Sequence, residues 1–159
     1  MKLTETEQKI ATYLAKARFN NARKKGIIDN KKGPQSNYNT DLDGVGSEMV
    51  AAKMLNVWPD LQIEKIPDHD LKINNITVDV KTTKYKTGKL IAALHKKEKA
   101  CDYYMLMIGS FPEYYCAGLC KKEDILNNDT ITNLGWGNLH AVDQISLQSL
   151  EDFLNETAA

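Results

Sequence analysis

The stretch PDHDLKINNITVDVKTT, residues 67–83, is the most informative part of the sequence. Within it, Asn74 and Asn75 separate two segments in which apolar and polar residues alternate. Alternation with a period of two predicts strands, and a two-residue asparagine connection predicts a tight hairpin turn, because asparagine tolerates the positive φ that such turns need. The stretch is therefore predicted to form two antiparallel strands, with Ile73 opposite Ile76.

This register fixes which side chains share a face of the hairpin, because successive side chains point to opposite faces of a strand. The polar face has Asp70 opposite Asp79, with Lys81 two residues further along. Like charges that face each other across a strand pair are destabilising, so the two carboxylates predict a positive group between them. The opposite face is apolar and consists of Leu71, Ile73, Ile76, Val78 and Val80.

The candidate catalytic residues of the hairpin are Asp70, Asp79 and Lys81. Carboxylate oxygens are hard ligands that suit Mg²⁺ or Mn²⁺. Such an ion can polarise a phosphoryl oxygen and lower the pKa of a bound water, and a lysine can hold that water or offset negative charge in the transition state. The alternative is a structural ion pair of Lys81 with the aspartates on a solvated face of the sheet.

A helix predicted over residues 43–56 supplies a third acid, Glu48. Ala51, Ala52 and Leu55 follow it at the helical spacings of three, four and seven residues, which places Glu48 on the stripe that faces the protein. A buried carboxylate needs a partner. Glu48 is therefore predicted to be buried and to serve as a further ligand of the metal.

Apolar periodicity and turn residues define the other elements. Thr4 and Glu7 have the spacing of a capping box, and Ser146 is the predicted N-cap of the last helix. Further helices are predicted over residues 4–25, 89–99, 120–127 and 146–155. Further strands are predicted over residues 61–66, 102–109 and 113–119, with a polar loop over 29–42 and a glycine-rich turn region over 133–140.

The composition excludes several classes of protein. The chain has 159 residues, 42% of them hydrophobic and 26% charged, and its 21 basic and 21 acidic residues give a net charge of zero. It is therefore neither a histone-like basic protein nor an acidic disordered one, and its length suits about one domain. No apolar run approaches the length of a membrane span. Three cysteines are too few for a disulfide framework, which predicts a cytoplasmic protein.

The zero net charge conceals a marked asymmetry. Residues 16–32 carry seven basic side chains against one acid, and residues 81–99 carry seven lysines against one acid, whereas residues 121–159 are acidic. Basic segments of this kind create a local positive field that attracts a polyanion. The predicted contacts with nucleic-acid phosphates are Arg18, Arg23, Lys24, Lys25, Lys84, Lys86 and Lys89.

The order of these residues resembles the PD-(D/E)XK nuclease superfamily. A helix with Glu48 is followed by a strand, by Asp70 on a hairpin arm, and by Asp79-Val80-Lys81. The literal pattern is also present, because Pro67-Asp68 precedes Asp79 with ten residues between them.

The resemblance implies a restriction-endonuclease-like core with the order α-β-β-β-α-β, in an α/β (α+β) fold whose mixed central sheet of about five strands is flanked by helices. It also implies roles: Asp70 and Asp79 would bind the metal, Lys81 would serve the attacking water, and Glu48 would be the helix acid. Asp68 fits the literal motif and Asp70 fits the hairpin register, so both are candidates for the first metal ligand.

The expected function is a DNA endonuclease that depends on Mg²⁺, for which Mn²⁺ can substitute, of the small resolvase-like, phage or homing type. Its expected organisation is one nuclease domain over residues 1–159, with a basic helix and loop over about 1–42 preceding the core. Cutting both strands of a duplex needs two active sites, so a homodimer or higher homo-oligomer is expected, with no membrane partner. The alternative is a catalytically inactive nucleic-acid-binding protein of the same fold.

Overall fold

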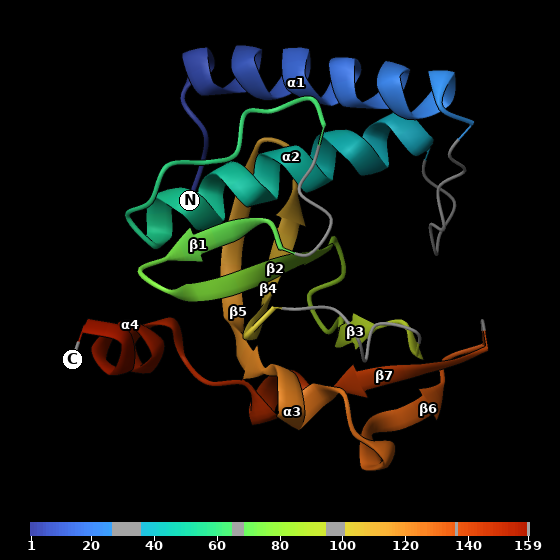
Figure 1. Ribbon diagram of the computed structural model, residues 1–159, viewed down its shortest axis with the longest axis vertical. Helices are drawn as coiled ribbons and strands as arrows, with labels where there is room; N and C mark the ends of the chain where they lie inside the picture. Colours follow the sequence, from blue (N-terminus) through green and yellow to red (C-terminus); the bar gives the residue numbers. More distant parts are fainter. Residues whose placement is uncertain (27–35, 65–68, 95–100, 136, 159) are drawn as a thin grey trace.

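A computed structural model describes residues 1–26, 36–64, 69–94, 101–135 and 137–158. These residues form a mixed α+β structure (Figure 1). The helices are α1 (Glu5–Lys24), α2 (Asn37–Met54), α3 (Lys122–Ile125) and α4 (Leu150–Ala158). The strands are β1 (Leu71–Ile73), β2 (Ile76–Thr83), β3 (Leu90–Ala92), β4 (Tyr103–Ser110), β5 (Glu113–Lys121), β6 (Ile131–Asn133) and β7 (Asn138–Val142).

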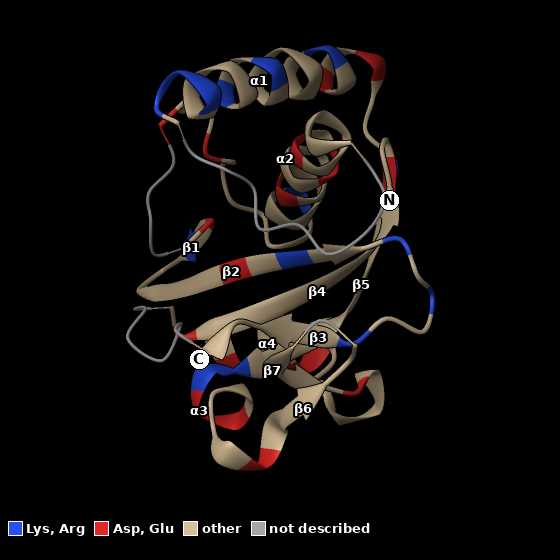
Figure 2. Cartoon of the chain, turned by 90° about the vertical axis from the view of Figure 1, so that its right-hand side faces the viewer, with Lys and Arg blue, Asp and Glu red and all other residues tan. Residues whose placement is uncertain are grey.

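The strands of the described residues belong to two sheets, whereas the family resemblance implies one central sheet of about five strands. The larger sheet has the order β1-β2-β4-β5, and the smaller one has the order β3-β7-β6. In the larger sheet β2 and β4 are parallel, whereas the β1–β2 and β4–β5 pairs are antiparallel. Figure 2 shows α1 and α2 on one side of the larger sheet and the smaller sheet on the other.

The two faces of the larger sheet contribute to separate apolar cores. Val78 and Val80 of β2 pack in a cluster with buried residues of α1 and α2. The opposite face of β4 contributes Tyr104, Leu106 and Ile108 to a second cluster, which includes Leu90 of β3. The alternation along β2 that the sequence predicts is thus present, with its apolar side chains facing the helices.

The predicted hairpin is confirmed in its position and in its register. Ile73 pairs with Ile76 and Leu71 with Val78, as the sequence predicts. Asn74 adopts a φ of 53°, which allows the tight reversal of the chain. Of the two turn residues only Asn74 takes the positive φ expected for both.

Local capping residues fix the ends of the helices. Thr4 and Glu7 form the predicted capping box at the start of α1. The second helix begins earlier than expected, because the Ser36 hydroxyl caps it and extends it back to Asn37. The last helix begins later than expected. The hydroxyl that accepts a backbone N–H of its first turn, that of Asp152, belongs to Ser149 and not to the predicted N-cap, Ser146.

Two predicted elements are wrong within the described residues. Residues 61–64 form no strand, although a strand is predicted over 61–66. Leu90–Ala92 form strand β3 and not the start of a helix over 89–99, because they pair with β7 and such tertiary pairing outweighs helical propensity. The other parts of these two predicted elements, residues 65–66 and 95–99, lie outside the described residues.

None of the described helices has the combination of length and apolar character that crossing a bilayer requires.

Gly109 near the end of β4 provides a test of the sheet. Its φ is 147°, and a Cβ atom added to it would lie 2.2 Å from the backbone oxygen of Glu113. We expect Gly109→Ala to lower the free energy of unfolding by about 1–3 kcal/mol, because alanine is strained in this conformation. The measurement is urea denaturation, with the slope m compared as well as the midpoint.

The matched control is Gly44→Ala in α2, where an added Cβ atom meets nothing within 4 Å. Alanine is favoured over glycine inside a helix, so this variant is expected to be as stable as the unaltered protein or slightly more stable. Equal effects of the two substitutions would contradict the strained conformation assigned to Gly109.

Candidate active site

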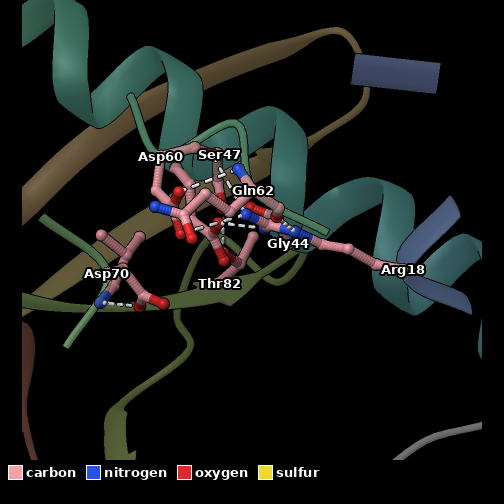
Figure 3. A network of polar contacts seen from close by, with 9 residues as sticks. Arg18, Gly44, Ser47, Asp60, Gln62, Asp70 and Thr82 are labelled. Carbon is pink, nitrogen blue, oxygen red and sulfur yellow. Dashed lines mark hydrogen bonds and ion pairs between the residues drawn. The ribbon is translucent and has the colours of Figure 1, made fainter. Parts of the chain in front are cut away.

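Asp70 lies immediately before β1 and is bonded to the centre of the DVK motif, Asp79-Val80-Lys81. Its backbone N–H donates to the carbonyl of Val78 at 3.0 Å, and its Oδ2 accepts the N–H of Val80 at 2.8 Å (Figure 3). The pairing of β1 with β2 ends at Leu71. Asp70 therefore does not form the predicted cross-strand pair with Asp79, and is joined to β2 through its side chain instead. The carboxylate of Asp70 is thereby fixed beside the residue that separates Asp79 from Lys81.

Asp79 and Lys81 form an ion pair on the same face of β2. Asp79 is buried and Lys81 is half-buried. Across the sheet, Asp79 is paired with Tyr104, and the Lys81 Nζ lies 5.8 Å from the centroid of the Tyr104 ring. The contact of Lys81 with Asp79 is expected for a catalytic group and also for a structural ion pair. It therefore does not distinguish between these two interpretations.

Glu48 is buried and has a charged partner, as its place on the helix stripe predicts. It is 8% exposed, and its Oε2 accepts a hydrogen bond from the Arg18 Nη1 at 2.9 Å. Arg18, which is also 8% exposed, donates in addition to the backbone oxygens of Gln62 and Asp60, each at 3.0 Å (Figure 3). The Asp60 carboxylate lies 3.5 Å from the same guanidinium.

This network changes the interpretation of Arg18. The sequence places Arg18 among the phosphate contacts because it belongs to the basic segment 16–32. In the structure its guanidinium is buried and joins α1, α2 and the segment that follows α2. We therefore assign Arg18 to the support of Glu48 and remove it from the proposed DNA-binding surface.

A cleft of about 280 Å³ lies between α2 and β2. Glu48 lines it from the helix, and Val80 and Lys81 line it from the strand. Lys84 and Tyr85, which follow β2, also line it. Glu48 and Lys81 thus border one cleft, but the Glu48 carboxylate is bonded to Arg18 and the Lys81 amine is paired with Asp79.

The described residues do not contain a group of three His, Cys, Asp or Glu side chains close enough to hold one metal ion. The predicted three-acid set does not assemble, because α2 with Glu48 covers the face of Val78 and Val80, whereas Asp79 points to the opposite face. Mg²⁺ is commonly held by only one or two carboxylates together with waters and substrate phosphates. The carboxylate oxygens of Asp70 and Asp79 are donors that fit such an ion. The other candidate for the first ligand, Asp68, lies outside the described residues.

The basic residues form two exposed groups. Lys24 and Lys25 are exposed at the end of α1, where Lys25 pairs with Glu64. Arg23 is half-buried, and its guanidinium carbon lies 5.0 Å from the centroid of the Phe19 ring. The loop between β2 and β3 exposes Lys84, Lys86 and Lys89.

One functional candidate, Tyr85, is absent from the sequence-based set. Arg18 is in that set with the wrong role, since a charge in a basic run gives no sign that it is buried. Tyr85 lies between Lys84 and Lys86 in the sequence, and this aromatic residue between two lysines is a signal from which it can be found.

No family model, no curated protein and no solved structure matches this chain.

Proposed function

We propose that this chain is a Mg²⁺-dependent DNA endonuclease whose active site is formed by Asp70, Asp79 and Lys81, with Glu48 as an accessory acid from α2. The bond from the Val80 N–H to the Asp70 carboxylate carries the proposal. It attaches the first acid to the backbone of the DVK motif, at the residue between Asp79 and Lys81. Glu48 lines the cleft between α2 and β2, which Lys81 also borders.

Each residue has a separate task in this proposal. A divalent ion, when bound, supplies a water of lowered pKa and neutralises charge on the phosphate. Asp70 and Asp79 hold that ion. Lys81 orients the attacking water and offsets the negative charge that develops on the phosphoryl oxygens. Glu48, held by Arg18, is an accessory acid on α2.

The proposal extends to the whole chain. It takes residues 1–159 as a single cytoplasmic nuclease domain with a restriction-endonuclease-like core, preceded by the basic helix and loop. Its partners are DNA and further copies of the chain, because two active sites are needed to cut a duplex. The parallel pairing of β2 with β4 and the antiparallel β1–β2 hairpin are compatible with such a core.

The test is incubation of the protein with supercoiled plasmid and with branched DNA, in Mg²⁺, in Mn²⁺ and in chelator. We expect nicking or linearisation only with metal. The alternative, an inactive nucleic-acid-binding protein, predicts binding in chelator with no cleavage under any of the metal conditions. An absence of both cleavage and binding at low salt would contradict both functions.

The exposed lysines at the end of α1 predict a salt-dependent contribution to binding. We expect Lys24→Ala and Lys25→Ala each to weaken binding equally for DNA of every sequence, since phosphates carry no sequence information. Each is expected to reduce the slope of log K against log salt by about one. The measurement is fluorescence anisotropy at several salt concentrations.

Lys9→Ala is the matched control, because Lys9 is also exposed on α1 but near its other end. It is expected to leave the salt slope unchanged. A loss of affinity at Lys24 or Lys25 that depends on the DNA sequence would contradict a phosphate contact.

A further inference from the structure

The loop between β2 and β3 presents an aromatic ring among lysines. Tyr85 is 57% exposed, and its neighbours Lys84 and Lys86 are exposed as well. The Lys84 Nζ lies 5.5 Å from the centroid of the Tyr85 ring. Figure 2 shows the loop projecting from the body of the molecule, with basic segments along it. A large exposed aromatic side chain in such a setting is available to a ligand.

Hydrogen bonds hold this loop in one conformation. The Gly88 N–H donates to the carbonyl of Tyr85 at 2.8 Å. Gln144, from the segment after β7, donates its Nε2 to the carbonyls of Lys86 at 2.9 Å and of Gly88 at 2.7 Å. These bonds restrain the backbone around Tyr85, and a restrained binding loop loses less entropy when a ligand binds.

The loop adjoins the proposed active site. Lys84 and Tyr85 line the same cleft as Glu48 and Lys81. A nucleic-acid strand whose phosphate lies in this cleft passes Lys84 and Tyr85, because both residues line it. The lysines of the loop offer contacts to the neighbouring phosphates, and the ring offers a flat apolar surface.

We propose that Tyr85 stacks on an unpaired base, and that the DNA recognised by this protein has a single-stranded segment beside the phosphate at the cleft. Bases inside a duplex are already stacked on each other, so a tyrosine at the surface cannot reach their faces. Single-strand binding sites combine cationic side chains for the backbone with aromatic rings for the bases, and both are present here. The assignment of this DNA as a substrate to be cut rests on the proposed nuclease function, whereas its binding does not.

The experiment measures binding in chelator, so that cleavage plays no part. Three labelled DNAs of one sequence are compared by fluorescence anisotropy: a single strand, a duplex, and a duplex with a single-stranded arm. We expect Tyr85→Ala to weaken binding to the single strand and to the armed duplex by about 5- to 150-fold. Binding to the plain duplex is expected to stay within about twofold, with the salt slope unchanged because tyrosine displaces no counterion.

Two further variants control for other causes. Tyr85→Phe keeps the ring and is expected to bind all three DNAs as the unaltered protein does. Tyr13→Ala removes another exposed tyrosine, 73% exposed on α1, and is expected to change nothing.

The inference is overturned if Tyr85→Ala binds the single strand as tightly as the unaltered protein does, or if it weakens binding to all three DNAs equally. Its failure is distinguishable from that of the proposed function. If metal-dependent cleavage is observed but Tyr85→Ala does not change binding, only the stacking role is wrong. If binding depends on Tyr85 and on a single-stranded segment but no DNA is cleaved, only the nuclease function is wrong.

Discussion

Replacing Asp79 with asparagine is expected to lower the rate of metal-dependent DNA cleavage by about 10³-fold or more. The substitution keeps the shape of the side chain but removes the negative charge that holds a divalent ion, and contributions of this kind to hydrolysis amount to several kcal/mol. DNA binding in chelator is expected to stay within a few-fold, because Asp79 is buried and contacts Lys81. The measurement is plasmid nicking under single-turnover conditions, with binding measured in parallel.

Lys81→Ala is expected to reduce cleavage by about 10²–10³-fold, the usual effect of removing one group that stabilises transition-state charge. Lys72→Ala is its matched control, because Lys72 is an exposed lysine on the facing strand of the same hairpin. Full activity in Asp79→Asn or in Lys81→Ala, with both variants folded, would contradict the roles assigned to them.

Replacing Arg18 with methionine is expected to lower the free energy of unfolding by about 3–5 kcal/mol, because it leaves the buried charge of Glu48 without its main partner. Both side chains are about nine-tenths buried, so solvent screens their interaction little. Glu48→Gln is expected to cost less, since Arg18 keeps its bonds to Asp60 and Gln62. The measurement is urea denaturation of each single variant and of the double variant.

The double variant, Arg18→Met with Glu48→Gln, is expected to be more stable than Arg18→Met alone, because no unpaired charge is left in the interior. If the two single effects simply add, the pair is not coupled and the assigned support of Glu48 is wrong.

A second outcome concerns DNA. Arg18→Met is expected to leave the salt slope of binding unchanged, in contrast to Lys24→Ala, because a buried guanidinium contacts no phosphate.

The sequence predicts those parts of the fold that depend on residues close together in the chain. The hairpin register follows from a two-residue turn and a period-two pattern, and Ile73 does pair with Ile76. The burial of Glu48 follows from helical periodicity, and the capping box at Thr4 follows from spacing. In each case a few residues adjacent in the sequence fix the outcome.

The parts that the sequence does not predict depend on distant partners. Leu90–Ala92 belongs to a predicted helix but pairs with β7, about fifty residues later. His140 falls in the predicted glycine-rich turn region, but it is buried and bonded to Thr130. Arg18 is read as a surface charge because its partners, Glu48 and Asp60, come from other elements.

A crystal soaked in Mn²⁺ and measured at a wavelength at which manganese scatters anomalously shows directly whether Asp70 and Asp79 hold a divalent ion. We expect an anomalous peak within coordination distance of the carboxylates of Asp70 and Asp79, near the Lys81 amine. A structure in which Mn²⁺ is absent from these two carboxylates, while the ion pair of Asp79 with Lys81 stays closed, would contradict it.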